Sequence, residues 1–275
     1  MAKYSILYYE VICMKETLAA IHTKRGFICD MDGVIYHGND LLPGAKEFVD
    51  WLYKENKQFL FLTNSSERSP LELSQKLARM GLNVEPTHFY TSALATADFI
   101  RGQCPGGSVY CIGEAGLHNA LYEAGLSMND VNPDYVVIGE TQNYNYQSIC
   151  KAVKLVLEGA KLIGTNPDTT GPGQGGVILP ACRALAAPIE LSTGKSAYFL
   201  GKPNPLMMKT GMKLLGCEPE ETIIVGDRMD TDIIAGIQSG TETVLVLTGV
   251  TTNEMLKDFP YGPKYILNGV GEIAL

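Results

Sequence analysis

Two aspartates separated by one residue follow an apolar run near the N-terminal end and could carry acid–base or metal chemistry. Asp30 and Asp32 come directly after residues 27–29. If that run is a strand, the alternation of side chains places both carboxylates on the same side. Two carboxylates so close resist simultaneous ionisation unless a cation lies with them, and Asp227, which follows a later apolar run, could be a third oxygen ligand of Mg²⁺. Taken alone, such an acidic pair is equally typical of a residue pair that caps a turn.

A second set of polar residues could hold a phosphate group. Thr63, Asn64 and Ser65 follow another apolar run and offer hydroxyl, amide and backbone N–H groups at a turn into a helix. Lys202 precedes Pro203, and a proline biases the residue before it away from helix, so we expect this lysine at a strand end. Seen separately, the first segment also fits an ordinary polar turn, and the lysine also fits an ordinary surface residue.

Continuous apolar runs alternate with helical patterns along the chain. The runs are residues 27–29, 59–62, 109–112, 135–138, 162–163, 198–200, 222–225 and 244–247. Continuous apolar character is typical of strands covered on both faces, and strand–helix alternation predicts a parallel α/β sheet. Since ligands of such sheets bind at the carboxyl ends of the strands, we expect the polar segments that follow four of these runs to meet at one edge of one sheet.

The helix with the clearest sequence signals begins after Ser69. Ser69 can cap it, Pro70 suits its first position, Glu72 completes a capping box and Gly81 ends it. On a later helix, we expect the isoleucines of residues 233–237 to face inward.

Four motifs, in this order, resemble those of the haloacid-dehalogenase-like (HAD) phosphatases. They are Asp30-x-Asp32-Gly33-Val34, Leu62-Thr63-Asn64, Gly201-Lys202-Pro203 and Val225-Gly226-Asp227-x-x-x-x-Asp232. The resemblance covers nearly everything from Arg25 onward, and the long insert between the second and third motifs resembles the class II cap of that family. Residues 130–141 and 165–168 resemble, more specifically, the NagD branch of nucleotide and p-nitrophenyl phosphatases.

The resemblance implies catalytic and metal-binding roles for four aspartates. Asp30 would be the nucleophile that forms an aspartyl-phosphate, and Asp32 would protonate the leaving oxygen and later activate water. Mg²⁺ would be bound by the carboxylates of Asp30 and Asp227 and by the backbone oxygen of Asp32. Asp232 would orient the metal's ligands through water or a hydrogen bond, without binding the metal itself.

The resemblance also implies the residues that hold the phosphoryl group. They would be Thr63, Asn64, Ser65 and Lys202. A lysine and a divalent cation on the phosphoryl oxygens would stabilise the negative charge of the transition state.

The domain organisation implied by the resemblance is a Rossmann-like parallel-sheet core with an inserted, smaller α/β cap. We expect the core in residues 1–88 and 195–275, with 1–24 as an extension of undefined structure, and the cap in residues 89–194. The cap would select the substrate, because the core recognises only the phosphoryl group. The candidate cap contacts are Asn166, Asp168, Thr169 and Thr170.

The substrate class implied is a small phosphomonoester, with nucleoside 5'-monophosphates favoured. Phosphoglycolate, a sugar phosphate or pyridoxal phosphate are the alternatives, and the motifs leave a phosphomutase open. A phospho-accepting signalling domain also places an Asp, a Thr or Ser and a Lys at strand ends, but such a domain is small and has no cap.

Composition restricts the remaining classes of protein. The chain has 275 residues, a formal net charge of -8 and 45% hydrophobic residues, which is enough apolar material for a core. Its acidity disfavours a nucleic-acid polymer as partner, and no apolar run has the ~20 residues of a membrane span. The 7 cysteines include no CxxC pair and are expected to be reduced. We therefore expect a cytoplasmic protein without membrane partners, and a homo-oligomer stays open.

Overall fold

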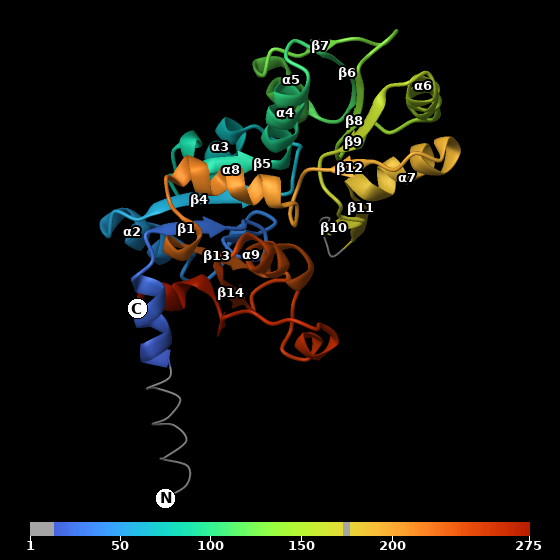
Figure 1. Cartoon of the computed structure of the whole chain (residues 1–275). Coiled ribbons are helices and arrows are strands. Elements are labelled where there is room, and N and C mark those ends of the chain that lie inside the picture. The colour runs from blue at the N-terminus through green and yellow to red at the C-terminus, as the bar shows by residue number, and fades with distance from the viewer. Residues whose placement is uncertain (1–13, 173–176) are drawn as a thin grey trace, which may run out of the picture. The chain divides into compact units, whose positions relative to one another are not determined.

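A computed structural model describes residues 14–172 and 177–275 of the chain (Figure 1). The chain forms two compact units, the first made of Met1–Phe61 and Gly211–Leu275 and the second of Leu62–Thr210. Each unit contains a parallel sheet, which confirms the predicted α/β class. The functional boundaries expected at 88/89 and 194/195 stay a prediction.

The first unit is built on parallel strands in the order β15-β14-β13-β1-β4. The strands are β1 (Gly26–Cys29), β4 (Gln58–Thr63, of which residues to Phe61 belong to this unit), β13 (Thr222–Gly226), β14 (Glu242–Val246) and β15 (Tyr265–Leu267), with a short hairpin of β2 (Tyr36–His37) and β3 (Asp40–Leu41). The helices are α2 (Ala45–Lys54), α9 (Ile234–Ser239), the π-helix η4 (Met229–Ile233) and the 3-10 turns η3 (Pro219–Glu221), η5 (Met255–Asp258) and η6 (Val270–Ala274). Helix α8 (Pro205–Leu215) crosses the boundary between the units.

The central strand β1 of the first unit is apolar and buried. Phe27, Ile28 and Cys29 of β1 are at most 1% exposed, as continuous apolar runs require when both faces of a sheet are covered. Cys29 pairs with Val225 of β13 and with Phe61 of β4. The strands β1 and β13 therefore end side by side, and the residues that follow them begin from neighbouring positions.

Part of the predicted N-terminal extension is ordered against the first unit. Residues 14–22 are helical, whereas residues 1–13 lie outside the described part of the chain. Ile21 is fully buried, and Nε2 of His22 lies 2.7 Å from the backbone oxygen of Ile273 in η6, beside which this helix lies (Figure 1). Lys57 donates to the backbone oxygen of His22 over 2.6 Å. The extension thus contributes to the core instead of standing apart from it.

The second unit has a parallel sheet in the order β12-β9-β8-β6-β7. Its strands are β6 (Ser108–Ile112), β7 (Ser127–Met128), β8 (Tyr135–Ile138), β9 (Lys161–Gly164) and β12 (Tyr198–Phe199), with β5 (Phe89–Thr91) and the hairpin of β10 (Thr170–Pro172) and β11 (Ile178–Pro180) outside this sheet. Its helices are α3 (Pro70–Arg79), η1 (Pro86–His88), α4 (Ser92–Gln103), α5 (Ala115–Glu123), α6 (Tyr146–Leu157) and α7 (Cys182–Thr193). Helices α6 and α7 cover one face of this sheet, and α4 and α5 lie on the other side (Figure 1).

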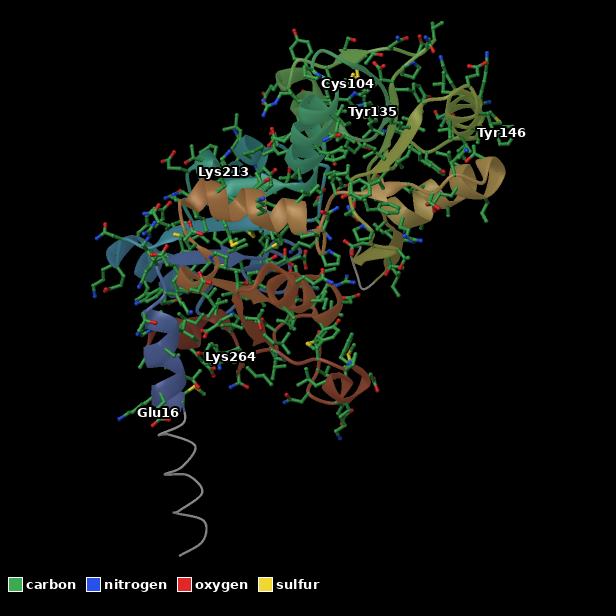
Figure 2. The ribbon with its side chains drawn as sticks, viewed as in Figure 1. Glu16, Cys104, Tyr135, Tyr146, Lys213 and Lys264 are labelled. Atoms are coloured by element: carbon green, nitrogen blue, oxygen red, sulfur yellow. The ribbon has the colours of Figure 1, made fainter. Side chains whose placement is uncertain are left out.

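The side chains of the second unit follow this layering. Tyr135 at the beginning of β8 is 3% exposed, whereas Tyr146 at the beginning of α6 is 76% exposed and points outward (Figure 2). Apolar residues of α6 and α7, among them Val156 and Ile189, pack with Val136 of β8 in one buried cluster. The sheet is therefore held by apolar contacts, while its loops are left to carry polar residues.

The structure agrees with one local helix prediction and differs from another. The helix after Ser69 is confirmed, with Pro70 at its start and a complete capping box formed by Ser69 and Glu72. The expectation that Ile237 faces inward is wrong, since this side chain is 42% exposed. The reason is η4, which takes up Met229–Ile233 as a π-helix and so rotates the α-helical stripe that follows it.

The run before Lys202 does not belong to the sheet of the first unit. Tyr198–Phe199 form β12, which pairs with β9 in the sheet of the second unit. The expectation that four polar segments end the strands of one sheet is therefore wrong for Lys202.

In the described part of the chain, no helix is long and apolar enough to cross a membrane.

Candidate active site

Three aspartates of the first unit form a compact group that we call the acid cluster: Asp30, Asp227 and Asp232. Each offers a carboxylate oxygen, and these oxygens lie within 4.8 Å of one another. Asp30 follows β1 and donates its backbone N–H to Val225 of β13 over 2.9 Å, which fixes the two strand ends together. The side chains of Asp227 and Asp232 are buried, at 2% and 1% exposure. The parallel register of β1 and β13 is thus what brings the first two carboxylates together.

The third carboxylate reaches the cluster through the π-helix after β13. Oδ2 of Asp232 accepts the backbone N–H of Arg228 over 3.1 Å, so the carboxylate is turned back toward the strand end. A Cβ added to Gly226 would lie 2.2 Å from the Cβ of Asp232. Only glycine allows this approach, which explains why β13 ends in glycine, directly before Asp227.

Asp227 is packed tightly by two further glycines. A Cβ on Gly249 would lie 2.0 Å from Oδ2 of Asp227, and one on Gly33 would lie 2.6 Å from the same atom. Gly33 has φ +78°, a conformation that glycine adopts without strain. The backbone N–H of Val250 donates to Oδ2 of Asp227 over 2.7 Å, and Thr248 donates to the backbone oxygen of Gly33 over 2.6 Å. The loop at residues 248–250 holds Asp227, and our sequence analysis did not identify it.

Asp32 lies in a more open environment than the acid cluster. Its side chain is 46% exposed, and Oδ1 lies 3.6 Å from Nδ1 of His37, which is on the β2–β3 hairpin. The backbone N–H of Gly33 donates to Tyr36 over 2.9 Å, which closes the hairpin onto the segment of Asp32. A carboxyl that is accessible to solvent can exchange protons with water or with a leaving group, whereas the buried carboxylates of the cluster are suited to fixed charge.

The acid cluster fits a divalent cation by its donor chemistry. Three carboxylates so close repel one another unless a positive charge lies among them. Carboxylate oxygens are the ligands that hard cations such as Mg²⁺ and Ca²⁺ take, and two of the three are already removed from bulk water. Asp30, Asp227 and Asp232 could therefore hold a divalent metal.

The predicted phosphate-binding residues lie together in the second unit. Thr63 and Lys202 are 9% and 3% exposed. The backbone N–H of Lys202 donates to Oδ1 of Asn64 over 2.7 Å, and Nδ2 of Asn64 donates to the backbone oxygen of Lys202 over 3.0 Å. Asn64 thus holds the backbone of Lys202 from both sides. The backbone N–H of Ser65 donates to the Thr63 hydroxyl over 3.1 Å, which shapes the turn after β4.

The four candidate cap contacts differ in their surroundings. Oδ2 of Asp168 accepts the side-chain amide of Asn64 over 3.0 Å, so Asp168 lies next to the predicted phosphate-binding residues. Thr169 and Thr170 are exposed, the latter at the beginning of β10. Asn166 is fully buried, and its amide donates to the backbone oxygen of Asn64 over 2.8 Å. In the described structure Asn166 therefore supports the loop from within.

Two residues at this site were missed by the sequence analysis, Ser66 and Glu140. The hydroxyl and the backbone N–H of Ser66 donate to the carboxyl of Glu140, the latter over 3.2 Å. Burial raises the pKa of Glu140 above its usual range, because water no longer solvates the charged form. The signal in the sequence was a Gly-Glu pair directly after the apolar run of β8, at the carboxyl end of a parallel strand.

Comparison with known proteins gives consistent matches. Residues 27–127 match the family described as "Haloacid dehalogenase-like hydrolase", and residues 199–273 match the one described as "HAD-hyrolase-like". The chain is 42% identical to the dihydroxyacetone phosphatase of Corynebacterium glutamicum (strain R), over 90% of either chain. It is also 42% identical to the ribonucleotide monophosphatase NagD of Escherichia coli (strain K12), over 91% of this chain and 98% of that protein. The solved structure of NagD from E. coli K-12 superposes with a TM-score of 0.85, covering 91% of this chain and 98% of that chain.

Proposed function

Because this chain belongs to the haloacid dehalogenase-like hydrolases, in the branch of NagD and the p-nitrophenyl phosphatases, we propose that it is a Mg²⁺-dependent phosphomonoesterase that acts through an aspartyl-phosphate. That it is a phosphatase of this family follows from the relatives that it matches over nearly its whole length. The observation that carries the finer proposal is the acid cluster, whose three carboxylate oxygens lie within 4.8 Å of one another.

The proposed reaction has two displacements at phosphorus. A carboxylate oxygen of Asp30 forms a bond to phosphorus while the bond from phosphorus to the leaving oxygen breaks, and Asp32 gives that oxygen its proton. Asp32 then takes a proton from water, whose oxygen displaces Asp30 from phosphorus and releases phosphate. The partly exposed side chain of Asp32 supports this assignment, since its proton must pass to the leaving group and return from water.

When bound, Mg²⁺ would supply positive charge to the phosphoryl oxygens and to Asp30. The residues that would hold it are Asp30 and Asp227 with their carboxylates and Asp32 with its backbone oxygen, while Asp232 orients the other ligands. The contact of Asp232 with the N–H of Arg228 supports an orienting role.

Thr63, Asn64, Ser65 and Lys202 are proposed to hold the phosphoryl oxygens in the same reaction. The hydrogen bonds between Asn64 and Lys202 and between Ser65 and Thr63 support this, because they hold these residues together at the end of β4. For Asn64 we propose its backbone N–H as the phosphate contact, because its side chain is already bonded to Lys202 and Asp168. The charge of Lys202 would stabilise the transition state.

As substrates we propose small phosphomonoesters, with nucleoside 5'-monophosphates first. The hydroxyls of Thr169 and Thr170 and the carboxylate of Asp168 could bind hydroxyl groups of a leaving group. The name of one relative, a ribonucleotide monophosphatase, supports nucleotides, and that of another, a dihydroxyacetone phosphatase, makes a triose phosphate the second candidate. Phosphate release from a panel of phosphomonoesters would order these classes by kcat/KM. A cytoplasmic location and a homo-oligomer stay predictions.

Replacing Asp30 by Asn should lower kcat by about 10⁴-fold or more, since the variant lacks the nucleophile. Chelation of divalent cations should abolish the activity of the unchanged protein, and Mg²⁺ should restore it. Phosphate release from p-nitrophenyl phosphate measures both effects. The matched control is Asp258→Asn, at an exposed aspartate of the first unit. Full activity of Asp30→Asn would contradict the nucleophile, and activity that persists under chelation would contradict the metal.

A further inference from the structure

Glu140, a half-buried residue just after the end of β8, turns its carboxyl group toward the buried residues Ser66 and Asn166 of the second unit. Oε2 of Glu140 accepts the backbone N–H of Ser66 over 3.2 Å and also the Ser66 hydroxyl, while Oε1 accepts the side-chain amide of Asn166. The backbone N–H of Glu140 donates in turn to the Ser66 hydroxyl over 3.3 Å. Both oxygens of the carboxyl are therefore occupied by donors from two other segments of the chain.

The segments around this carboxyl are in close contact. A Cβ on Gly139 would lie 2.8 Å from the Ser66 hydroxyl oxygen, and one on Gly201 would lie 2.7 Å from Oδ1 of Asn64 and from the Cβ of Asn166. Ser66 and Asn166 are fully buried. Glycine at these two positions is needed for the backbones to approach, so the contacts of Glu140 are set by packing as well as by hydrogen bonds.

The contacts continue from Glu140 to the residues proposed to hold phosphate. The amide of Asn166, which donates to Glu140, also donates to the backbone oxygen of Asn64 over 2.8 Å. The side chain of Asn64 brackets the backbone of Lys202, with hydrogen bonds of 2.7 and 3.0 Å. We call Asn64, Ser66, Glu140, Asn166 and Lys202 the buried polar network. Glu140 is the one carboxyl in it, and it contacts Ser66, which directly follows the predicted phosphate-binding residues Thr63–Ser65.

A carboxyl group at this position lowers the stability of the fold, so we expect it to serve a purpose other than stability. Removing it from water is unfavourable, and burial accordingly raises the pKa of Glu140. An apolar residue would avoid that cost but would leave the N–H of Ser66 and one N–H of the Asn166 amide without the acceptor that Glu140 provides. A glutamine has a single acceptor oxygen, so its NH₂ group would face a donor at one end. Only a carboxyl accepts at both ends, which ties the segments of Ser66 and Asn166 to each other.

We propose that Glu140 is a positioning residue of the phosphatase reaction, which fixes the turn of Thr63–Ser65 through Ser66 and the backbone of Lys202 through Asn166 and Asn64. This inference rests on the proposed function, in which those residues hold the phosphoryl oxygens. A displacement of well under 1 Å in such groups is enough to lower the rate, because their value depends on orientation. Glu140 itself is not proposed to touch the substrate.

The test is the Glu140→Gln variant of the full chain, with Glu123→Gln as the matched control at an exposed position of α5. We expect kcat/KM to fall about 10–100-fold for Glu140→Gln, by the same factor for p-nitrophenyl phosphate and for a nucleoside monophosphate. The inhibition constant of inorganic phosphate should rise, since phosphate reports on the oxygen-binding groups and has no leaving group. The control should keep the unchanged protein's values.

A purely structural role for Glu140 predicts a different set of results. Well below its melting temperature, a Glu140→Gln variant with unchanged kcat/KM and phosphate inhibition would overturn the proposal, as would a loss confined to one substrate. If Glu140→Gln does not fold, Ser66→Ala decides: it removes one donor and should lower kcat/KM about 3–10-fold, a smaller loss of the same kind. A folded Ser66→Ala with unchanged kinetics would also overturn it.

The same assay separates this inference from the function on which it rests. If Lys202→Ala is impaired and Glu140→Gln is not, only the positioning role fails. If Lys202→Ala keeps full activity, the assignment of the phosphate-holding residues fails, and the inference fails with it.

Discussion

The acid cluster of the first unit and the buried polar network of the second unit are assembled by different physical means. In the first, the parallel register of β1 and β13 and the close approach of three glycines bring carboxylates together in spite of their repulsion. In the second, side-chain hydrogen bonds join segments that are far apart in the sequence, and the one carboxyl, Glu140, is surrounded by donors. The donor chemistry of the first arrangement fits a divalent cation, whereas the carboxyl of the second is bound by hydrogen-bond donors of the protein. The first region thus concentrates negative charge, whereas the second fixes the orientation of polar groups.

Among the variants that test this contrast between the two regions, we expect Lys202→Ala to lower activity the most. The variant loses the ammonium group proposed to contact phosphoryl oxygens, and kcat/KM should fall about 10²–10³-fold. The fold should persist, because Asn64 binds the backbone of residue 202, which alanine retains. Steady-state kinetics and thermal unfolding measure the two properties. Lys195→Ala, at an exposed lysine of the same unit, is the control.

Two results of that experiment would break the comparison. Full activity would mean that the lysine is a buried structural residue and that the network orients nothing for catalysis. Unfolding of Lys202→Ala would mean that its side chain, rather than the hydrogen bonds of Asn64, holds this region together.

Gly249→Ala should have an intermediate effect and act on the acid cluster alone. The new Cβ would lie 2.0 Å from Oδ2 of Asp227, so the carboxylate or the loop must move. We expect the Mg²⁺ concentration for half-maximal activity to rise about 10-fold or more, and the variant to be destabilised by about 1–3 kcal/mol. Titration of activity with Mg²⁺ and denaturant unfolding test this.

Gly262→Ala serves as its control, because nothing lies within 4 Å of a Cβ there. If the two glycine variants behave alike, packing on Asp227 does not set the geometry of the cluster, and the contrast between the two regions is lost.

The same contrast explains which parts of the molecule the sequence could predict. Capping of the helix at Ser69 and the strand ends at Asp30 and Asp227 follow from local rules of backbone geometry, and the structure agrees with them. The strand before Lys202 pairs with β9 and not with a strand of the first unit. The sequence could not predict this, because an apolar run indicates a strand but not the strand with which it pairs.

Glu140 was overlooked for a related reason. Its importance comes from donors at residues 66 and 166, and no spacing in the sequence records which segments meet. The loop at residues 248–250 was missed likewise, since its contact with Asp227 depends on tertiary packing.

The smallest predicted effect is on the pH dependence of stability, and it separates Glu140 from Glu72. Burial raises the pKa of Glu140, so this carboxyl binds a proton more tightly in the folded protein than in the unfolded chain. Glutamates of an unfolded chain have a pKa of about 4.3. The stability contributed by protonation of Glu140 is therefore fully present below that pH and is lost as pH rises through the folded-state pKa. For Glu72, the hydrogen bond from the backbone of Ser69 lowers the pKa, so its contribution is present above the unfolded pKa and is lost as pH falls through the folded one.

Denaturant unfolding of the unchanged protein and of Glu140→Gln between pH 4 and pH 8 measures this difference. The buried thiol of Cys182, whose pKa is raised by burial to about 12, stays protonated throughout and does not interfere. As pH rises, we expect the free energy of unfolding of the unchanged protein to fall relative to that of Glu140→Gln. Relative to that of Glu72→Gln, it should rise. A difference that is constant with pH would mean that the donors of Ser66 and Asn166 fully compensate the burial of this carboxyl. The network would then resemble the capping box at Ser69 in its electrostatics, and it would differ from the acid cluster, in which carboxylates lie beside one another.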